Sequence, residues 1–356
     1  MQETKNRKIR VLIVDDSPLI RRLLTEILSV DPIFEIIAHA SNGEEAVKFA
    51  RIFKPDIISM DMLMPVMDGL EATKTIKQNF PLPIVIASSI YKDQEKLLAI
   101  EELNAGAVAV VPKPEGPAHP DFIDSSVKYR NVIKIMSEVK VIKRSSKVKS
   151  MPDKESVPCK SCTTLKKISL VAIGASAGGP EAVRIILENL EHPVKVPIVI
   201  VQHIDPHFTD SYASWLDSTC LSNVKVAENG EELSAGNIYI APGKRHLEIT
   251  SYYSIKLSDE HNQEKWNGHI PSIDLFFDSI SRNMANETYS ALLSGMGRDG
   301  ANGLLNLRKN GSFTVIQDKN SALIFGMPGE AEKLGAACKI RSPYEIAQEI
   351  NYLLNK

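Results

Sequence analysis

Apolar runs alternate with helix-like segments along the first third of the chain. The run Ile9–Val14 is rich in aliphatic residues and predicts a buried strand, and Pro18–Val30 carries Leu and Ile at helical spacing. Further strands are expected at FEIIAHA, DIISMD, IVIASS and AVAVV, with helices near 44–53, 95–103 and 122–143. Five strands alternating with helical segments predict a doubly wound parallel sheet covered on both faces, which is an α/β fold.

The same alternation returns in the second half of the chain. ISLVAIG, PIVIVQ and YSALLSG predict buried strands, and each is followed by a polar or glycine-rich turn and a helical pattern. The segment from NIYIAPG to SIKLS predicts hairpins. We therefore expect a second α/β domain with a mostly parallel sheet.

Charge marks the boundary between the two halves. The net charge is -2, yet the stretch 126–167 holds twelve Lys or Arg and three Asp or Glu, and it has no sustained apolar period after about residue 142. Such a stretch is typical of a helix end followed by a solvated linker. We expect a first domain over 1–125, a terminal helix and basic linker over 126–166, and a second domain over 167–356.

Composition narrows the class of protein. Hydrophobic residues make up 43% and charged residues 24%, as in ordinary globular proteins. The net charge indicates no nucleic-acid partner. No apolar run approaches the roughly 20 residues that span a bilayer, so we expect no integral membrane segment. The polar N-terminus indicates no signal peptide, and four cysteines suit a reducing compartment, so a cytoplasmic location is expected. Cys159 and Cys162 form a CxxC pair without a second pair, which favours solvated thiols over a zinc site.

Acidic residues stand where two strands of the first domain end. Asp15 and Asp16 follow the first strand, and Asp61 ends the third. Ligands bind at the carboxyl ends of strands in doubly wound sheets, and clustered carboxylates suit Mg²⁺. Ser88 and Lys113 follow the next two strands, where a hydroxyl and an ammonium would bind a phosphoryl group. The alternative is that the paired aspartates only cap the helix that follows them.

The order of these motifs resembles the receiver domain of two-component response regulators. DD-S-P, MD-x-x-MP-x-MDG, SS and KP follow the successive strands over about residues 8–125. The resemblance implies a flavodoxin-like five-stranded sheet and a histidine kinase as phosphodonor. It also implies Asp61 as phosphoacceptor, Mg²⁺ held by Asp15, Asp16 and Asp61 with the backbone of Leu63, Ser88 as switch hydroxyl, and Lys113 on the phosphoryl group.

Two positions depart from the receiver pattern. Val110 stands where receivers usually carry an aromatic switch residue, and Leu63 stands where a polar residue is common. The first affects how phosphorylation is relayed, and the second affects the access of hydrolytic water to the phosphoryl group.

A candidate nucleophile opens the second domain. The predicted strand 168–174 runs into GASAGG, which is G-x-S-x-G between a strand and a helix and presents Ser176 on a sharp turn. A glycine-rich phosphate cradle or a plain tight turn is the alternative. His203 follows the next strand and Asp299 follows a third, so one triad member comes from each of three strands. Asp205 is a competing acid. The order Ser, His, Asp differs from that of α/β-hydrolases.

These segments resemble the chemotaxis protein-glutamate methylesterase (CheB) family. GASAGGPEA, IVQHI, NIYIAPG, HIPSIDLFF, LLSGMGRDG and FGMP occur in this order over about residues 168–350. The resemblance implies hydrolysis of glutamate methyl esters and deamidation of glutamines on chemoreceptors, with Ser176 as nucleophile, His203 as base and Asp299 as orienting acid. It implies the backbone N–H of Met296 in the oxyanion hole and no cofactor for hydrolysis. Ala177 replaces a threonine common in the family.

HIPSIDLFF is expected to begin a helix, with a secondary role for His269 at the substrate rim. The resemblance further implies that the unphosphorylated receiver packs over the catalytic edge and that phosphorylation relieves this inhibition. Two other functions would join the receiver to a DNA-binding output domain or to a noncatalytic nucleotide-binding scaffold. Buried strands in the second half disfavour the first, and the absence of G-x-G-x-x-G spacing in GASAGG disfavours the second.

Overall fold

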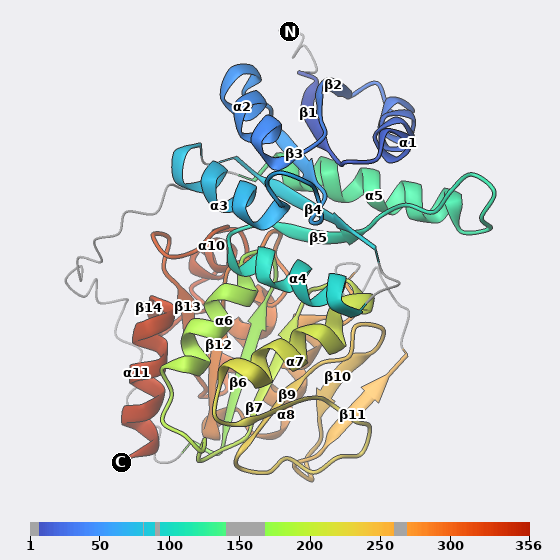
Figure 1. Cartoon of the computed structure of the whole chain (residues 1–356). Coiled ribbons are helices and arrows are strands. Elements are labelled where there is room, and N and C mark those ends of the chain that lie inside the picture. Colours follow the sequence, from blue (N-terminus) through green and yellow to red (C-terminus); the bar gives the residue numbers. More distant parts are fainter. Residues whose placement is uncertain (1–6, 81, 90–92, 140–167, 260–268) are drawn as a thin grey trace, which may run out of the picture. The chain divides into compact units, whose positions relative to one another are not determined.

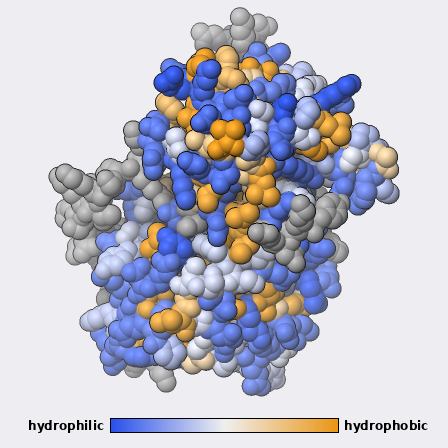
Figure 2. Space-filling view, viewed as in Figure 1, coloured by the Kyte–Doolittle hydropathy of each residue, from blue (hydrophilic) through white to orange (hydrophobic). Residues whose placement is uncertain are grey.

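The computed structural model describes residues 7–80, 82–89, 93–139, 168–259 and 269–356, in two units that divide between Lys143 and Arg144. The predictions for Cys159 and Cys162 and for most of the basic linker fall outside the described residues. Each unit has its own parallel sheet (Figure 1). On the face seen in Figure 2, hydrophilic residues cover most of the surface, as expected where helices turn their apolar sides inward.

The first unit alternates strands and helices as predicted, and the helix Gly69–Asn79 adds an element that the sequence analysis did not locate. Its elements are β1 (Ile9–Val14), α1 (Pro18–Ser29), β2 (Phe34–Ala40), α2 (Gly43–Phe53), β3 (Ile57–Met60), α3 (Gly69–Asn79), β4 (Ile84–Ser88), α4 (Asp93–Asn104), β5 (Ala109–Pro112) and α5 (Phe122–Ser137). The strands form one parallel sheet in the order β2-β1-β3-β4-β5. Helix α1 packs beside α5, and α3 packs beside both α2 and α4 (Figure 1). This is the flavodoxin-like arrangement, with its crossover point at β1 and β3.

The second unit is built around a seven-stranded parallel sheet. Its strands are β6 (Leu170–Ala175), β7 (Ile198–Gln202), β8 (Asn223–Val226), β9 (Asn237–Ile240), β12 (Thr288–Leu292), β13 (Phe313–Gln317) and β14 (Lys339–Arg341), in the order β14-β13-β12-β6-β7-β9-β8. All its pairings are parallel. Every residue of β6, β7 and β12 is buried, because helices cover both faces of the sheet.

Two groups of helices cover this sheet (Figure 1). They are α6 (Gly179–Glu188), α7 (Thr209–Thr219) and α11 (Pro343–Leu354) in one group, and α8 (Ile273–Asn283), α9 (Ala301–Lys309) and α10 (Met327–Lys333) in the other. Helix α6 contacts both α7 and α11, and α9 contacts both α8 and α10. Short 3-10 turns occupy Pro206–Phe208 and Ala285–Glu287.

The prediction of hairpins from NIYIAPG to SIKLS was only partly right. β10 (His246–Ile249) and β11 (Ile255–Ser258) do form an antiparallel pair. β9 instead joins the main sheet, parallel to both β7 and β8. Its alternation of apolar residues fits either arrangement, so the pattern alone could not distinguish them.

Candidate functional site

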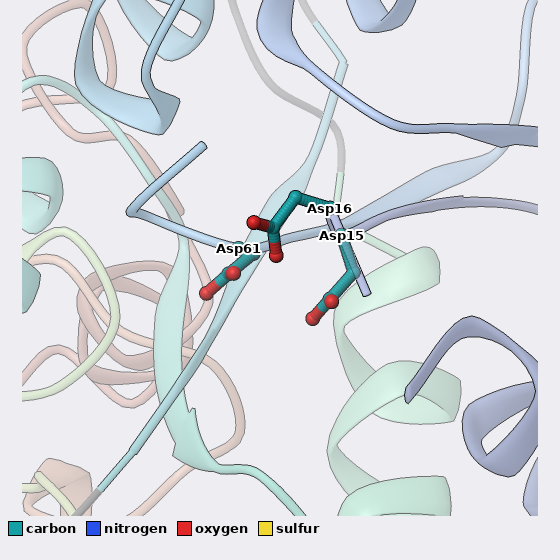
Figure 3. Close-up of side chains that lie close together, drawn as sticks. All are labelled: Asp15, Asp16 and Asp61. Carbon is teal, nitrogen blue, oxygen red and sulfur yellow. The ribbon is translucent and has the colours of Figure 1, made fainter. Parts of the chain in front are cut away.

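The three predicted acidic residues of the first unit meet at one edge of its sheet. Asp15 and Asp16 follow β1 and Asp61 follows β3, and Figure 3 shows their side chains close together. One carboxylate oxygen from each lies within 4.8 Å of the others. Asp15 and Asp61 are buried, and Asp16 is exposed. An all-carboxylate set with one side open to water suits Mg²⁺, which prefers oxygen ligands and keeps several waters.

Lys113 joins this cluster as predicted. Its Nζ lies 2.8 Å from Asp15 Oδ2 and 2.9 Å from Asp61 Oδ1. Burial raises the pKa of Asp61 to about 6, with Asp15 adding to the shift and Lys113 opposing it. Burial also disfavours the Lys113 ammonium, but Asp61 and Asp15 outweigh this, so the pKa of Lys113 is raised. The ammonium therefore stays charged where a phosphoryl group on Asp61 would need a partner.

Ser88 ends β4 at the same edge of the sheet. Met60 and Ile86 are paired across β3 and β4, so Asp61 and Ser88 both stand just beyond that pair. The Lys113 N–H donates to the Ser88 carbonyl at 2.8 Å, which ties the ends of β4 and β5 together. The two departures from the receiver pattern differ in exposure, since Val110 is buried and the Leu63 side chain is exposed.

Ser176 lies on the sharp turn between β6 and α6. Its N–H donates to the Ser294 carbonyl at 3.0 Å, and its carbonyl accepts from the Gly179 N–H at 2.8 Å. Gly178 has φ of 76°, a left-handed conformation that glycine adopts without strain. This is the strand–turn–helix setting that G-x-S-x-G requires.

His203 stands beside this turn. Its N–H donates to the Ala175 carbonyl at 2.9 Å, one residue before Ser176. Its Nε2 lies 3.0 Å from Asp299 Oδ2, and its side chain is only 11% exposed. Within the described residues, Nδ1 and Nε2 are both buried and neither makes a hydrogen bond of standard geometry, so the contact of Nε2 with Asp299 is a close polar contact. With the ring proton directed from Nε2 to Asp299, Nδ1 carries the lone pair that a general base needs.

Asp299 is held by the start of α8. Its Oδ2 accepts from the Ile273 N–H at 2.9 Å, and its Oδ1 accepts from the Asp274 N–H at 3.0 Å and the Ser272 hydroxyl at 3.2 Å. Burial opposes ionisation, but His203 and these N–H donors outweigh it, so the pKa of Asp299 is lowered. The helix terminus supplies free N–H groups and positive dipole to the carboxylate.

The competing acid, Asp205, contacts a different histidine. Its Oδ1 lies 2.7 Å from His207 Nδ1 and also accepts from the His207 N–H at 3.0 Å. Asp299 therefore has the better geometry for orienting His203.

Met296 follows a residue that lies against Ser176. A Cβ placed on Gly295 would lie 2.7 Å from Ser176 Cβ and would overlap Met327 Sδ, so only glycine fits this contact. The backbone of Met296 therefore begins next to the serine turn. Ala177 is buried, and its carbonyl accepts from the Ser294 hydroxyl at 2.8 Å.

Two residues that hold this site were not predicted from the sequence. Gln202 is buried, and its Nε2 donates to the carbonyls of Ser176 at 2.8 Å and His203 at 3.0 Å, which bridges the two turns. Ser272 caps α8 through the Leu275 N–H, as a helix start in HIPSIDLFF allows, and it also donates its hydroxyl to Asp299, which the sequence did not indicate. Gln202 could have been found from the sequence, because a polar amide at the end of a buried strand needs hydrogen-bond partners. For Ser272 there was no such signal.

Family models of known proteins match both units. Residues 171–350 match the CheB methylesterase family model, and residues 11–119 match the response regulator receiver domain. The chain is 39% identical over 96% of its length to protein-glutamate methylesterase/protein-glutamine glutaminase 3 of Hahella chejuensis, covering 98% of that protein. The chain belongs to the CheB methylesterase family. The member from Escherichia coli K12 is 36% identical, with 96% of each chain covered.

A solved structure resembles the second unit. The CheB methylesterase catalytic domain of Thermotoga maritima is 34% identical, with a TM-score of 0.50, and the match covers 52% of this chain and 99% of that one. The family match over 171–350 rules out a DNA-binding output domain there. Among the described residues, no helix combines the length and the apolar character needed to cross a membrane.

Proposed function

We propose that this protein hydrolyses methyl esters of glutamate side chains on chemoreceptors and deamidates receptor glutamines, under the control of phosphorylation at Asp61. The observation that carries the proposal is the 3.0 Å contact of His203 with Asp299 beside the Ser176 turn. Family membership supports the substrate and adds the receiver as the regulatory unit. It also supports a histidine kinase as phosphodonor and a cytoplasmic location.

In the proposed reaction, Ser176 Oγ attacks the ester carbonyl while His203 Nδ1 takes the hydroxyl proton. The backbone N–H of Met296 stabilises the oxyanion. Collapse of the tetrahedral intermediate breaks the bond to methoxide, which leaves as methanol with the proton from His203. Water then attacks the acyl-enzyme while His203 takes a proton from the water. His203 passes this proton to Ser176 Oγ as the acyl bond breaks, which restores the serine. With a glutamine substrate, ammonia leaves in place of methanol. None of these steps requires a cofactor.

Asp299 stays ionised throughout this cycle and stabilises the imidazolium of His203. Its three donors at the start of α8 keep the carboxylate anionic and fix its direction. An aspartate in this role orients the base and does not itself take the proton.

In the regulatory unit, an Asp61 carboxylate oxygen attacks the phosphorus of the kinase phosphohistidine. The N–P bond breaks, and the phosphoryl group moves to Asp61. Mg²⁺, when held by Asp15, Asp16 and Asp61, would neutralise charge on the phosphoryl oxygens. Lys113, which contacts Asp61 directly, would then pair with the new phosphoryl group, and Ser88 would bind one of its oxygens.

The test is methanol release from methylated receptor membranes by the full-length protein. Ser176→Ala is expected to abolish release, and retained turnover would refute the triad. Addition of a small phosphodonor with Mg²⁺ is expected to raise the rate in the native protein and to have no effect in Asp61→Asn. A noncatalytic scaffold would release no methanol under any of these conditions.

A further inference from the structure

His269 lies directly against the ring of the proposed catalytic base. The imidazoles of His269 and His203 are stacked, with ring centroids 4.3 Å apart and an angle of 14° between their planes. Such a contact is close and nearly parallel, as in offset-stacked aromatic pairs. His269 is an exposed residue, so it closes one face of the His203 ring toward solvent.

One short segment therefore contacts both His203 and its orienting acid. His269 stacks on the base, and three residues later Ser272 donates its hydroxyl to Asp299. Ser272 is fixed in turn by its N–H, which donates to His246 Nδ1 on β10 at 3.1 Å. The short segment 269–274 at the start of α8 thus carries both His269 and the groups that donate hydrogen bonds to Asp299.

The contact with Asp299 leaves the His203 ring one degree of freedom. A single contact at Nε2 sets the direction of one ring edge, but the ring plane can still turn about that line. Turning the plane would change the direction of Nδ1, which takes the serine proton in the proposed mechanism, and misplacement by about 1 Å can cost about 100-fold in rate. A second ring stacked on the first restricts this rotation.

His269 can fill this place without adding charge. Although the residue as a whole keeps an exposed surface, its ring loses water where it lies against His203. This loss of water and then repulsion from His203 lower the pKa of His269 to about 4, against a weaker opposing effect of Asp299. His269 is therefore neutral at pH 7. A cation at this position would oppose the imidazolium that forms on His203 during the reaction.

We propose that His269 is a positioning residue, which holds the plane of the His203 ring by stacking and shields one face of that ring from water. The inference rests on the proposed role of His203 as base. It goes beyond a role at the substrate rim, because it predicts an effect on the chemical step.

Two variants separate stacking from hydrogen bonding. His269→Phe keeps an aromatic ring and loses the polar atoms, whereas His269→Gln keeps polar atoms and loses the ring. We expect His269→Phe to retain kcat for methanol release, and His269→Gln to lower kcat about tenfold with little change in KM. His269→Ala should resemble His269→Gln.

The pH profile gives a second readout. Of the titratable groups in the part of the chain that the structure describes, His269 stacks on the His203 ring and Asp299 contacts its Nε2. Loss of the stacked ring would admit water to that face of His203, and water favours the charged imidazolium over the neutral base. The acidic limb of kcat/KM should therefore move to higher pH in His269→Gln and His269→Ala, and should stay in place in His269→Phe.

Several results would overturn the inference. It fails if His269→Gln and His269→Ala keep the native kcat and profile, or if His269→Gln is active and His269→Phe is not. A rise in KM alone in all variants would assign His269 to the substrate rim. Circular dichroism of each full-length variant checks that it folds. The test needs only one folded variant without an aromatic ring, either His269→Gln or His269→Ala. Ser176→Ala keeps His269 unchanged, so this variant tests the proposed function separately in the same assay.

Discussion

Asp61 and Asp299 both lie just beyond buried parallel strands, yet their surroundings change their pKa values in opposite directions. Asp61 is buried beside Asp15, and its pKa is raised to about 6 despite Lys113. Asp299 is also removed from water, but His203 and two backbone N–H groups of α8 lower its pKa. Both carboxylates therefore lie at the edge of a sheet, where ligands bind. The groups that contact each carboxylate then determine its pKa and the role it suits. The first suits a phosphoacceptor, and the second suits a permanent anion.

The largest effect is expected for Asp61→Asn. The amide cannot accept a stable phosphoryl group, so incorporation of labelled phosphate from a small phosphodonor should disappear. Chelation of Mg²⁺ should have the same effect on the native protein. Asp56→Asn is the matched control, since Asp56 lies at the other end of β3 and pairs with Arg7. Phosphate incorporation by Asp61→Asn would exclude Asp61 as the phosphoacceptor.

Asp299→Asn should lower kcat for methanol release by about 10³–10⁴, because the amide favours the wrong tautomer of His203. Asp205→Asn changes the other acid near this edge, which contacts His207, and should leave kcat near the native value. If the two variants exchanged these effects, Asp205 would be the orienting acid.

Ser272→Ala should lower both the stability of the protein and kcat, and its effect on kcat should be smaller than that of Asp299→Asn. It removes one donor to Asp299 and the cap of α8, so we expect a loss of about 1 kcal/mol in stability and about tenfold in kcat. Ser342→Ala removes the analogous cap from α11, away from the site, and should cost similar stability without lowering kcat. Urea unfolding and methanol release measure the two effects, and equal kcat values in both variants would argue against a role for Ser272.

The smallest effect on activity is expected at Glu102, a buried carboxyl in α4 that accepts from the Thr73 hydroxyl at 3.2 Å. Burial raises its pKa from 4.5 to about 8, with Asp68 and Asp61 adding to the shift and Thr73 opposing it. Between these pH values the folded protein holds more protons than the unfolded chain. Stability should therefore be highest at low pH within this window, fall as pH rises through it, and level off above pH 8.

Glu102→Gln should remove this dependence and stabilise the first unit at pH 8 by about 1–3 kcal/mol relative to the native protein. The difference should shrink toward pH 5. Urea unfolding of the full chain at the two pH values measures it, and Glu101→Gln on the same helix is the control. Parallel stability curves for native protein and Glu102→Gln would contradict the raised pKa.

Sequence patterns predicted much of the fold and most site residues because both depend on local order. Strand and helix periods located the elements of the first unit except α3, and the carboxyl ends of parallel strands necessarily share an edge. Asp15, Asp61 and Lys113 could therefore be placed together from their positions in the sequence, and so could Ser176 and His203. The same local pattern was insufficient for β9, which pairs with β7 and β8 across the sheet.

The family, the alternation of elements and the residues at the strand ends follow from local order along the chain. Packing, by contrast, placed Asp299 and not Asp205 against His203, set Asp299 at the start of α8, and stacked His269 on the His203 ring. The physical reason is that these contacts join residues far apart in the chain, where direction and distance depend on packing. Spacing along the sequence cannot specify them.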